Sequence, residues 1–470
     1  MKAVENHIET NSLVKFLFVH QNFPAQFLHI VRYLVRLKRH EIVFITEPNA
    51  NVMTGVRKVP YNPLPATSSD VHWTIRELEL AVRRAERVAG TARNLRELGF
   101  DPDIIIGHHG WGELLALQDV WPSCPMLGYY EFFYQTERSD VGFDSEFPTP
   151  TEDFPRIRAK NAINLLALAG PSRGQTPTKW QLSTYPAWAQ EKITLLPEGV
   201  DLATCRPDPT ARRAPLKIGD WEISPDERLV TYVARDLDPY RGCHVLLRAL
   251  PRLFRRRSDV RVVMVGGNGV SYGSPPPQGS WKDLFVAELG DRLDRRRVLF
   301  PGRVPYGTYI RLLQRSDAHV YLTYPFVASW SLREALAAGC AVIGSDTPPV
   351  REFIAHRRTG LLAPFLDPDQ LADAILTVLD DEALSTRLRA GARLWAEANL
   401  AMADYLTAYL ELIASLAGDR AEGLTLPRER PVPFDDRRRG HTSKPANVRS
   451  AAAPHDMSFN ESRTRSARRR

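Results

Sequence analysis

Short apolar runs alternate with amphipathic segments along most of this chain. The first apolar run, residues 15–19, precedes an amphipathic segment at 25–37 and a second apolar run at 41–45. Similar apolar runs recur later in the chain, at 103–107, 229–234, 260–265 and 318–323. Apolar runs of this length are typical of buried strands, and the amphipathic segments between them are typical of helices. The alternation predicts an α/β protein with parallel sheets, which bind ligands beyond the carboxyl ends of their strands.

Polar residues follow the first predicted strand. His20, Gln21 and Asn22 come directly after residues 15–19. At this edge they would either line a substrate site or only cap the helix that follows, and the sequence supports both interpretations equally. A G-x-G-x-x-G pattern is missing here, which argues against a dinucleotide cofactor.

Two histidines follow the strand at 103–107, in the string His108-His109-Gly110-Trp111-Gly112-Glu113. Neighbouring histidines point apart, and no third ligand has suitable spacing, so we do not expect a metal site. A polar ligand-binding edge explains this composition better than simple packing does. We expect His108 to lie in that site, with His109 and Trp111 beside it.

A single acid, Glu131, interrupts the aromatic run at 128–134. It could bind hydroxyl groups of a ligand while Tyr130 or Tyr134 stacks on a face of that ligand. Buried aromatic packing with an exposed acid is the alternative interpretation.

Two arginines flank a predicted strand-to-helix turn in the second half. Arg235 follows the strand at 229–234, and Arg241 precedes the next helix. Guanidinium groups bind phosphate oxygens in pairs, so this arrangement suits a diphosphate. Exposed arginines on a surface loop are the alternative. The glycine turn at 266–269, which includes Gly267, would let the backbone approach a ligand, although such a turn is weak evidence by itself.

The segment at 317–352 predicts a strand, a polar loop, a helix and another strand. Ser329 or Ser331 can cap the helix, and Gly339 ends it. A helix N-terminus at the carboxyl edge of a parallel sheet suits a phosphate group. An ordinary packing unit of the same order is the alternative that this pattern leaves open.

The residues of this segment resemble the nucleotide-sugar signature of retaining glycosyltransferase family 4. Glu334 to Gly339 reads E-A-L-A-A-G, and Ser345-Asp346 is followed by Glu352. The first glutamate of the signature, eight positions before Glu334, is replaced by Phe326 within Y-P-F-V-A-S-W-S-L, which resembles a bacterial branch of the family. The resemblance extends over about residues 15–415.

The resemblance implies a GT-B fold, with two Rossmann-like domains whose parallel sheets face a central cleft. The N-terminal acceptor-side domain would occupy residues 14–205 and the nucleotide-sugar domain 216–398. A helix at 399–417 would cross back to the N-terminal domain, ahead of a tail at 418–470.

The resemblance further implies retaining transfer of a sugar from a UDP- or GDP-sugar to a saccharide, lipid or small-molecule acceptor, without a metal or other cofactor. The expected catalytic residues are His108, Arg235, Arg241 and Glu334. Donor binding is expected at Arg235, Arg241, Gly267, Arg303, Val304, Ala328, Ser329, Trp330, Ser331 and Glu334. The expected acceptor or cleft residues are His20, Asn22, His109, Trp111 and Glu131. Alternatives are a nucleotide-sugar epimerase or hydrolase of the same architecture, and a non-catalytic sugar-nucleotide-binding protein, which Phe326 would favour.

Composition and charge predict a disordered tail, a cytoplasmic location and reduced cysteines. Residues 418–470 hold thirteen Arg or Lys against seven Asp or Glu, so they carry six of the seven net positive charges. With many prolines and few large apolar residues, the tail is predicted to be disordered, with at most a weak contact to an anionic membrane surface and no nucleic-acid partner. No apolar run reaches about 18 residues, and residues 1–13 lack a signal-peptide core. We expect a cytoplasmic protein, and the basic tail leaves peripheral association with the inner face of the membrane open as an alternative. The scattered Cys124, Cys205, Cys243 and Cys340 predict buried reduced thiols.

Overall fold

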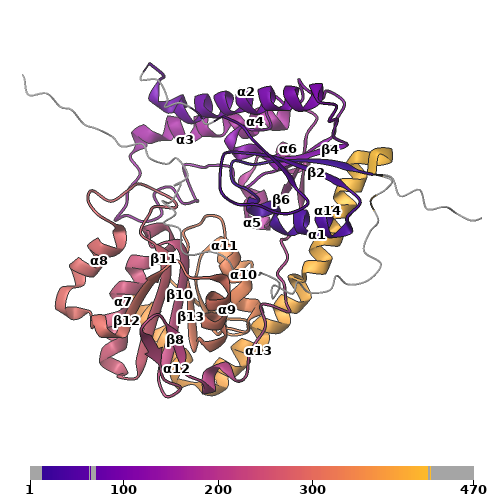
Figure 1. The fold of residues 1–470 in the computed structure, drawn as a ribbon. Coiled ribbons are helices and arrows are strands. Elements are labelled where there is room, and N and C mark those ends of the chain that lie inside the picture. The colour runs from indigo at the N-terminus through magenta and orange to yellow at the C-terminus, as the bar shows by residue number, and fades with distance from the viewer. Residues whose placement is uncertain (1–12, 63, 65–69, 422–423, 425–470) are drawn as a thin grey trace, which may run out of the picture. The chain divides into compact units, whose positions relative to one another are not determined.

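Two parallel β-sheets, one in each half of the chain, form the framework of the protein (Figure 1). The computed structural model describes residues 13–62, 64, 70–421 and 424. These residues belong to one unit that ends at Pro433, and the second unit, Phe434–Arg470, lies outside the described residues. The predicted α/β class with parallel sheets is confirmed.

The first sheet has seven strands, in the order β3-β2-β1-β4-β5-β6-β7. Its strands are β1 (Lys15–Val19), β2 (Glu41–Thr46), β3 (Arg57–Pro60), β4 (Ile104–His108), β5 (Met126–Tyr129), β6 (Arg173–Thr176) and β7 (Ile193–Leu195). Every neighbouring pair is parallel. β1, β2 and β4 are almost wholly buried because their apolar side chains pack on both faces of the sheet, as continuous apolar runs predict.

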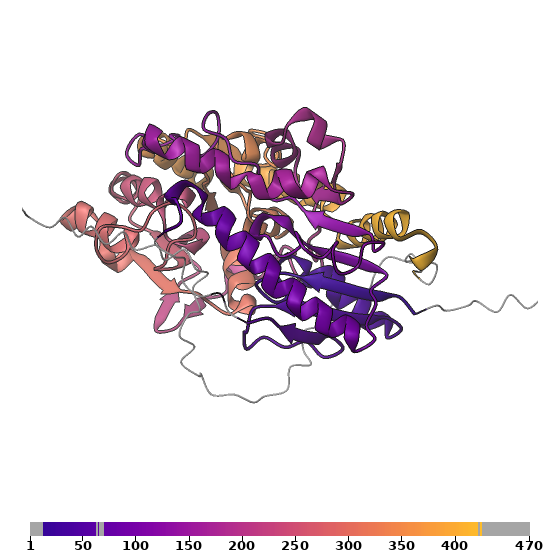
Figure 2. The ribbon, with the colours of Figure 1, turned by 90° about the horizontal axis from the view of Figure 1, so that it is seen from above.

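Helices cover both faces of this sheet. They are α1 (Leu28–Leu37), α2 (Arg76–Glu97), α3 (Phe154–Lys160), α4 (Ala162–Ala169), α5 (Lys179–Thr184), α6 (Ala187–Gln190) and, from the end of the chain, α14 (Met402–Ala417). In Figure 1, α2 lies on one side of the sheet and α1 with α14 on the other; Figure 2 shows α2 from above. The last helix packs there because Tyr409, Leu410 and Ile413 are fully buried in the same apolar cluster as β1.

The second sheet has six strands, in the order β12-β11-β10-β13-β14-β15. Its strands are β10 (Arg228–Asp236), β11 (Val260–Gly267), β12 (Val298–Gly302), β13 (Ala318–Tyr321), β14 (Val342–Ser345) and β15 (Leu361–Ala363). The surrounding helices are α7 (Cys243–Arg256), α8 (Trp281–Leu289), α9 (Tyr306–Arg315), α10 (Trp330–Ala337), α11 (Pro348–Arg351), α12 (Pro368–Asp380) and α13 (Glu382–Asn399). A short antiparallel pair, β8 (Leu216–Ile218) and β9 (Trp221–Ile223), precedes them.

Each sheet reverses its strand order at one point. In the first sheet the chain builds outward from β1 to β3, then resumes on the other side of β1 with β4. In the second sheet the same reversal falls between β10 and β13. Loops leave such a point in opposite directions and open a crevice at the carboxyl ends of the strands, which is where open α/β sheets bind ligands. The topology therefore predicts that ligand-binding residues follow β1, β4, β10 and β13.

The end of the described chain corrects one predicted boundary. A short 3-10 helix, Gly418–Ala421, continues beyond α14, and Ala421 and Leu424 are buried against the core of the first sheet. The predicted start of the tail at 418 is therefore too early, because two apolar side chains after that point are packed. Arg437–Arg439, Arg468–Arg470 and the rest of the predicted tail lie outside the described residues.

The cysteines and the helices can be compared with what the composition predicted. All four cysteines are free and buried, which confirms the predicted thiols. Of the helices in the described part of the chain, none combines the length and apolar character that crossing a membrane requires.

Candidate functional site

The reversal point of the first sheet brings two predicted histidines together. His20 directly follows β1, and His108 is the last residue of β4. Their rings lie 5.6 Å apart in an edge-to-face arrangement. Both side chains are buried, at 5% and 2% exposure. Asn22, which sits beside them in the sequence, is exposed, and its backbone N–H donates to His20 Nδ1.

His109 lies in the core behind the strand ends. It is 1% exposed, and its ring is 4.9 Å from that of Tyr130. Gly128 is required beside it, because a Cβ there would lie 1.9 Å from the His109 ring. Burial, together with the neighbouring His108, lowers the pKa of His109 to about 3. The structure therefore separates the two adjacent histidines, and it brings only His108 into contact with His20.

Trp111 supports His108. Its ring stacks on the His108 ring at 6.0 Å, and its carbonyl accepts a hydrogen bond from Arg84 Nη1 at 2.7 Å. Arg84 is buried beside Glu113, with Nε 3.9 Å from the Glu113 carboxylate. Burial raises the pKa of Glu113 despite the opposing charge of Arg84. Reasoning from the sequence missed Arg84, because a charged residue within the amphipathic helix α2 resembles its exposed neighbours.

Glu131 faces His108. Its Oε2 lies 3.5 Å from His108 Nε2, at the outer limit of a hydrogen bond. Burial raises the pKa of Glu131, but the interaction with His108 and the charges of Arg235 and Arg241 outweigh burial and lower it overall. Glu131 is thus a carboxylate held between an imidazole of the first half and two cations of the second.

The two predicted cations differ in their surroundings. Arg235 is exposed near the end of β10, and the described residues form no hydrogen bond or ion pair with its guanidinium. Arg241 is buried, and its Nη1 donates to Thr323 Oγ1 at 2.8 Å and to the Val327 carbonyl at 2.9 Å. The charge of Arg235 also contributes to lowering the pKa of His20, after burial, the neighbouring His108 and the charge of Arg84. The two reversal points therefore face each other, with Arg235 available to a ligand and Arg241 engaged in holding the loop after β13.

Other predicted donor residues cluster at the end of β11. Arg303 Nη2 lies 3.3 Å from Asp236 Oδ1, while its side chain remains 65% exposed. A Cβ at Gly267 would lie 2.3 Å from the same Asp236 oxygen, so any larger residue there would have to displace the Asp236 carboxylate. Val304 is partly buried and packs against the apolar clusters around α9.

Phe326 fills an aromatic cluster in the place of the signature glutamate. It is 5% exposed, and its ring lies 4.7 Å from that of Phe132 and 4.8 Å from that of Tyr272. Tyr240 adds an edge contact at 5.8 Å. Phe132 follows β5 in the first half, whereas Tyr272 belongs to the proline-rich loop after β11. The replacement thus joins segments from both halves of the chain.

The start of α10 is held by side chains of the protein. Ala328 is buried, and Ser329 N donates to Tyr321 Oη at 2.7 Å. Ser329 stands at the N-cap, but its hydroxyl bonds to Ser331 Oγ at 2.6 Å and caps no backbone N–H. The expected capping hydroxyl is therefore engaged with its neighbour.

Glu198, which the sequence did not mark as a candidate, links α10 to the first half. It accepts from Trp330 Nε1 at 2.8 Å and pairs with Arg333 Nη1 at 3.0 Å. Tyr129 Oη donates to its other oxygen at 3.2 Å. The Trp330 indole, predicted to face the donor, is engaged in this contact. Glu198 carried no local signal, since its three partners come from β5 and α10.

Two signature acids accept hydrogen bonds from the protein. Glu334 accepts from the hydroxyls of Tyr306 and Tyr309, each at 2.8 Å, and burial raises its pKa. Glu352 accepts from the backbone N–H groups of Lys179 and Trp180, at 2.8 and 3.0 Å. Glu352 therefore caps helix α5 of the first half from the second half.

Asp144, Glu146 and His244 place potential metal-ligand atoms within 4.8 Å of one another. Asp144 Oδ2 accepts from Tyr324 Oη and lies 3.1 Å from His244 Nε2, while both Glu146 oxygens pair with Arg248. These groups form a second set of contacts between the two halves of the chain.

The two halves match two family models. Residues 38–205 match a model described as glycosyl transferase family 4 group, and residues 215–395 match one described as glycosyl transferases group 1. A phosphatidyl-myo-inositol mannosyltransferase of Mycolicibacterium smegmatis is 30% identical over 217 residues, 45% of this chain and 47% of that protein. A D-inositol 3-phosphate glycosyltransferase of Corynebacterium efficiens is 25% identical over 324 residues, 67% of this chain and 71% of that protein. The match thus spans about half the length of the first relative.

Solved structures show the same architecture. A sucrose-phosphate synthase from Thermosynechococcus elongatus superposes with a TM-score of 0.64 and 18% identity, covering 86% of this chain and 99% of that one. The Anabaena protein HepE, in complex with UDP-glucose, gives a TM-score of 0.63 and 16% identity over 86% of this chain and 100% of its own. At this identity the likeness establishes the fold, and it confirms the predicted pair of parallel-sheet domains.

Proposed function

The chain belongs to the family 4, group 1 glycosyltransferases, which have the GT-B fold, and on this premise we propose which reaction its site performs. The protein transfers a sugar from a nucleotide-diphosphate sugar to a hydroxyl of a saccharide, lipid or small-molecule acceptor, with retention of the anomeric configuration. The proposal assigns donor binding mainly to the second sheet and acceptor binding mainly to the first. Arginines supply the positive charge, so the reaction needs neither a metal ion nor another cofactor.

One observation carries this proposal. Arg235 presents an exposed guanidinium without a protein partner among the described residues, at the end of the strand where the second sheet reverses its order. A diphosphate is the ligand that such a group binds best, because two N–H donors match two phosphate oxygens. Across from it stand His108 and Glu131, which are suited to sugar hydroxyls. The complex of HepE with UDP-glucose supports a sugar nucleotide as the ligand.

The chemistry follows from these positions. The bond between the sugar C1 and the diphosphate oxygen breaks, and a bond forms from C1 to the acceptor oxygen. The acceptor proton passes to the departing diphosphate. Arg235 stabilises the negative charge that develops on the leaving group, which is typically the largest contribution to catalysis in such sites.

Arg241 and Glu334 have narrower roles than the sequence suggested. Arg241 adds its charge from a buried position while it fixes the loop at 323–327. Glu334 would bind the ribose only by exchanging a tyrosine hydroxyl for a ribose hydroxyl. Tyr306 is the partner suited to this exchange, since it is 47% exposed.

Release of nucleoside diphosphate tests the proposal. Wild type, Arg235→Ala and Arg228→Ala are incubated with UDP- and GDP-sugars, with and without a pooled acceptor extract. We expect acceptor-dependent release, reduced by roughly 10²–10³ in Arg235→Ala and retained in Arg228→Ala, whose side chain lies at the opposite end of β10. Release that does not depend on the acceptor would indicate a hydrolase, and absence of release with every donor would indicate a binding protein.

A further inference from the structure

His20 and His108 are held in the same way. Register between β1 and β4 pairs Val19 with Gly107, so the two histidines leave the sheet side by side. The backbone N–H two residues later points at each Nδ1: Asn22 N lies 2.8 Å from His20 Nδ1, and Gly110 N lies 2.9 Å from His108 Nδ1. Two neighbouring strand ends thus repeat one arrangement.

This arrangement fixes the position of the ring protons. A backbone N–H always carries its hydrogen, so an Nδ1 that faces it at hydrogen-bond distance has to accept and cannot itself be protonated. Asn22 O also lies 3.1 Å from His20 Nδ1, but the closer N–H decides the role of that nitrogen. Each ring is therefore neutral, with its proton on Nε2, and each can only donate there.

The donor of His108 lacks a well-aligned partner. Its Nε2 is buried and forms no hydrogen bond with the described residues, although the Glu131 carboxylate lies 3.5 Å away. Buried polar groups are nearly always hydrogen-bonded, so the unused His108 donor indicates a ligand that accepts from it. The Glu131 carboxylate beside it has a side chain that is 36% exposed, so it is free to accept from the same ligand. A hydroxyl group meets both requirements, because it accepts one hydrogen bond and donates another.

We propose that Glu131, which accepts from the sugar hydroxyl that His108 contacts, selects the transferred sugar by charge: it admits an uncharged hydroxyl at that position and excludes sugars that carry a carboxylate there. This inference rests on the proposed function and names its substrate class. The hydroxyl accepts from His108 Nε2–H and donates to Glu131 Oε2. A sugar carboxylate at this position could accept from His108 Nε2–H, but it has no proton to donate to Glu131. Its negative charge would also lie close to the negative charge of Glu131.

The neighbouring charges are consistent with this exclusion. His20 offers no positive charge, since burial, then the neighbouring His108 and then the charges of Arg84 and Arg235 keep its pKa well below the usual value. The charges of Arg235 and Arg241 both act on Glu131 and lower its pKa. In the proposed complex the diphosphate offsets these two charges, which leaves Glu131 to repel a second anion.

Paired donors test the exclusion. Titration calorimetry compares UDP-glucose with UDP-glucuronate and GDP-mannose with GDP-mannuronate, with UDP and GDP alone as controls. For the nucleotide that binds, we expect wild type to favour the neutral sugar at least about tenfold, and Glu131→Gln, which keeps the shape, to lose most of this preference. Equal affinity for both sugars in wild type, or an unchanged preference in Glu131→Gln, would overturn the inference. If neither UDP nor GDP binds, the proposed function fails instead.

The ring protons are tested separately, without any ligand. Long-range ¹H–¹⁵N NMR of ¹⁵N-histidine protein distinguishes the tautomers, and His108→Gln and His108→Leu identify the signal. We expect a neutral ring with an unprotonated Nδ1; a proton on Nδ1 would overturn the assignment. His108→Gln should lose less affinity for the neutral donor than His108→Leu, because the glutamine amide places an N–H near Nε2. Melting curves of both variants check that the fold is retained.

Discussion

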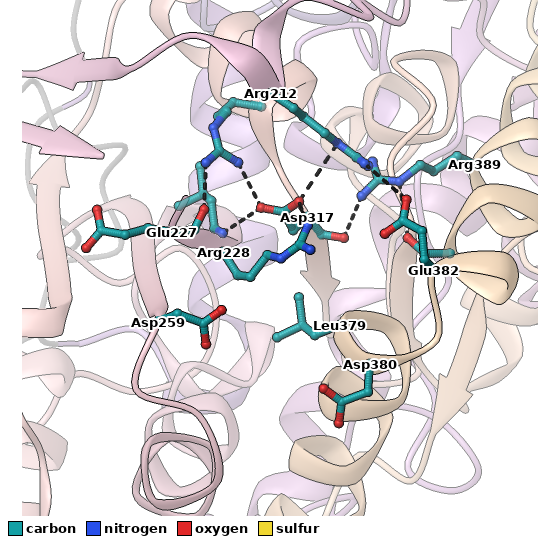
Figure 3. A network of polar contacts seen from close by, with 12 residues as sticks. Arg212, Glu227, Arg228, Asp259, Asp317, Leu379, Asp380, Glu382 and Arg389 are labelled. Atoms are coloured by element: carbon teal, nitrogen blue, oxygen red, sulfur yellow. Dashed lines mark hydrogen bonds and ion pairs between the residues drawn. The ribbon is translucent and has the colours of Figure 1, made fainter. Parts of the chain in front are cut away.

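Strand β10 carries an arginine near each end, and the two differ in whether the protein provides partners for the guanidinium group. Arg228, its first residue, belongs to a network around the buried carboxylate of Asp317 (Figure 3). Asp317 Oδ2 accepts from Leu229 N and Arg315 Nη1, both at 2.8 Å, and its Oδ1 lies 3.4 Å from Arg228. Arg389 donates to the Asp317 carbonyl at 2.6 Å. Arg235, at the other end, has no such partner among the described residues.

The difference indicates where this fold uses charge for stability and where for binding. At the amino ends of the strands, a buried acid has donors on both oxygens, so its charge is compensated within the protein. At the carboxyl ends, His108 Nε2, both Glu113 oxygens and Asp238 Oδ1 are buried without a hydrogen bond in the described structure. Groups of this kind cost stability and are retained where a ligand or a proton uses them.

We expect the largest loss of stability when the network around Asp317, at the amino ends of the strands, is broken. Asp317→Ala leaves Arg315, which is 1% exposed, as a buried charge without its carboxylate. Breaking a buried pair in this way costs about 3–5 kcal/mol of unfolding free energy. Urea unfolding measures it. Asp373→Ala is the matched control, because its pair with Arg252 is exposed and should cost no more than about 1 kcal/mol. Equal losses in the two variants would remove the distinction between the two kinds of pair.

A similar loss is expected at the carboxyl end when Phe326 becomes the signature glutamate. Phe326→Glu removes an aromatic ring packed against Phe132 and Tyr272 and introduces an acid into a nearly closed position. Loss of a buried Phe alone costs about 3–5 kcal/mol, so we expect reduced stability and no gain in turnover. Thermal melting and the nucleotide-release assay measure both quantities. A stable variant with higher activity would show that the position still serves the donor sugar.

Asp238 should make stability depend on pH. Burial raises its pKa to about 6, against hydrogen bonds from Ser271 and Tyr272 and the charge of Arg241, which lower it. Since this pKa exceeds the unfolded value near 3.9, the folded protein holds the proton more tightly, and stability falls as the pH rises from about 4 to about 6.

Asp238→Asn removes this titration. Relative to wild type, the variant should gain about 2 kcal/mol of unfolding free energy between pH 4 and pH 7, because most of a shift of about two pH units, at about 1.4 kcal/mol per unit, falls within this range. Urea unfolding at both pH values measures the change. Parallel pH curves for the two proteins would show that Asp238 is not buried as described.

The smallest effect concerns the contact that Glu352 makes between the two halves. Its carboxylate caps helix α5 through Lys179 N and Trp180 N, and loss of a helix cap costs about 1 kcal/mol. We expect Glu352→Ala to lower stability by that amount and Glu352→Gln by less, since the amide oxygen still accepts. A loss of several kcal/mol would mean that this acid holds the two halves together.

The sequence predicted the strand ends better than it predicted the roles of the side chains there. His20, His108 and Arg235 were found because apolar runs mark buried strands and polar residues follow them directly. Arg241 looked equivalent to Arg235, but its partners lie more than eighty residues away, at Thr323 and Val327. The partners of Phe326 likewise come from distant segments. Local patterns locate an edge of a sheet, whereas burial depends on what the rest of the chain packs against it.

The most direct test uses the two arginines of the same strand. Titration calorimetry with UDP and GDP compares wild type, Arg235→Ala and Arg228→Ala. The account predicts that one nucleotide binds wild type, that Arg235→Ala weakens this affinity at least about tenfold through loss of a charge-assisted hydrogen bond, and that Arg228→Ala leaves it unchanged. Absence of binding to both nucleotides, or equal losses in the two variants, would contradict a diphosphate site at the carboxyl end of β10.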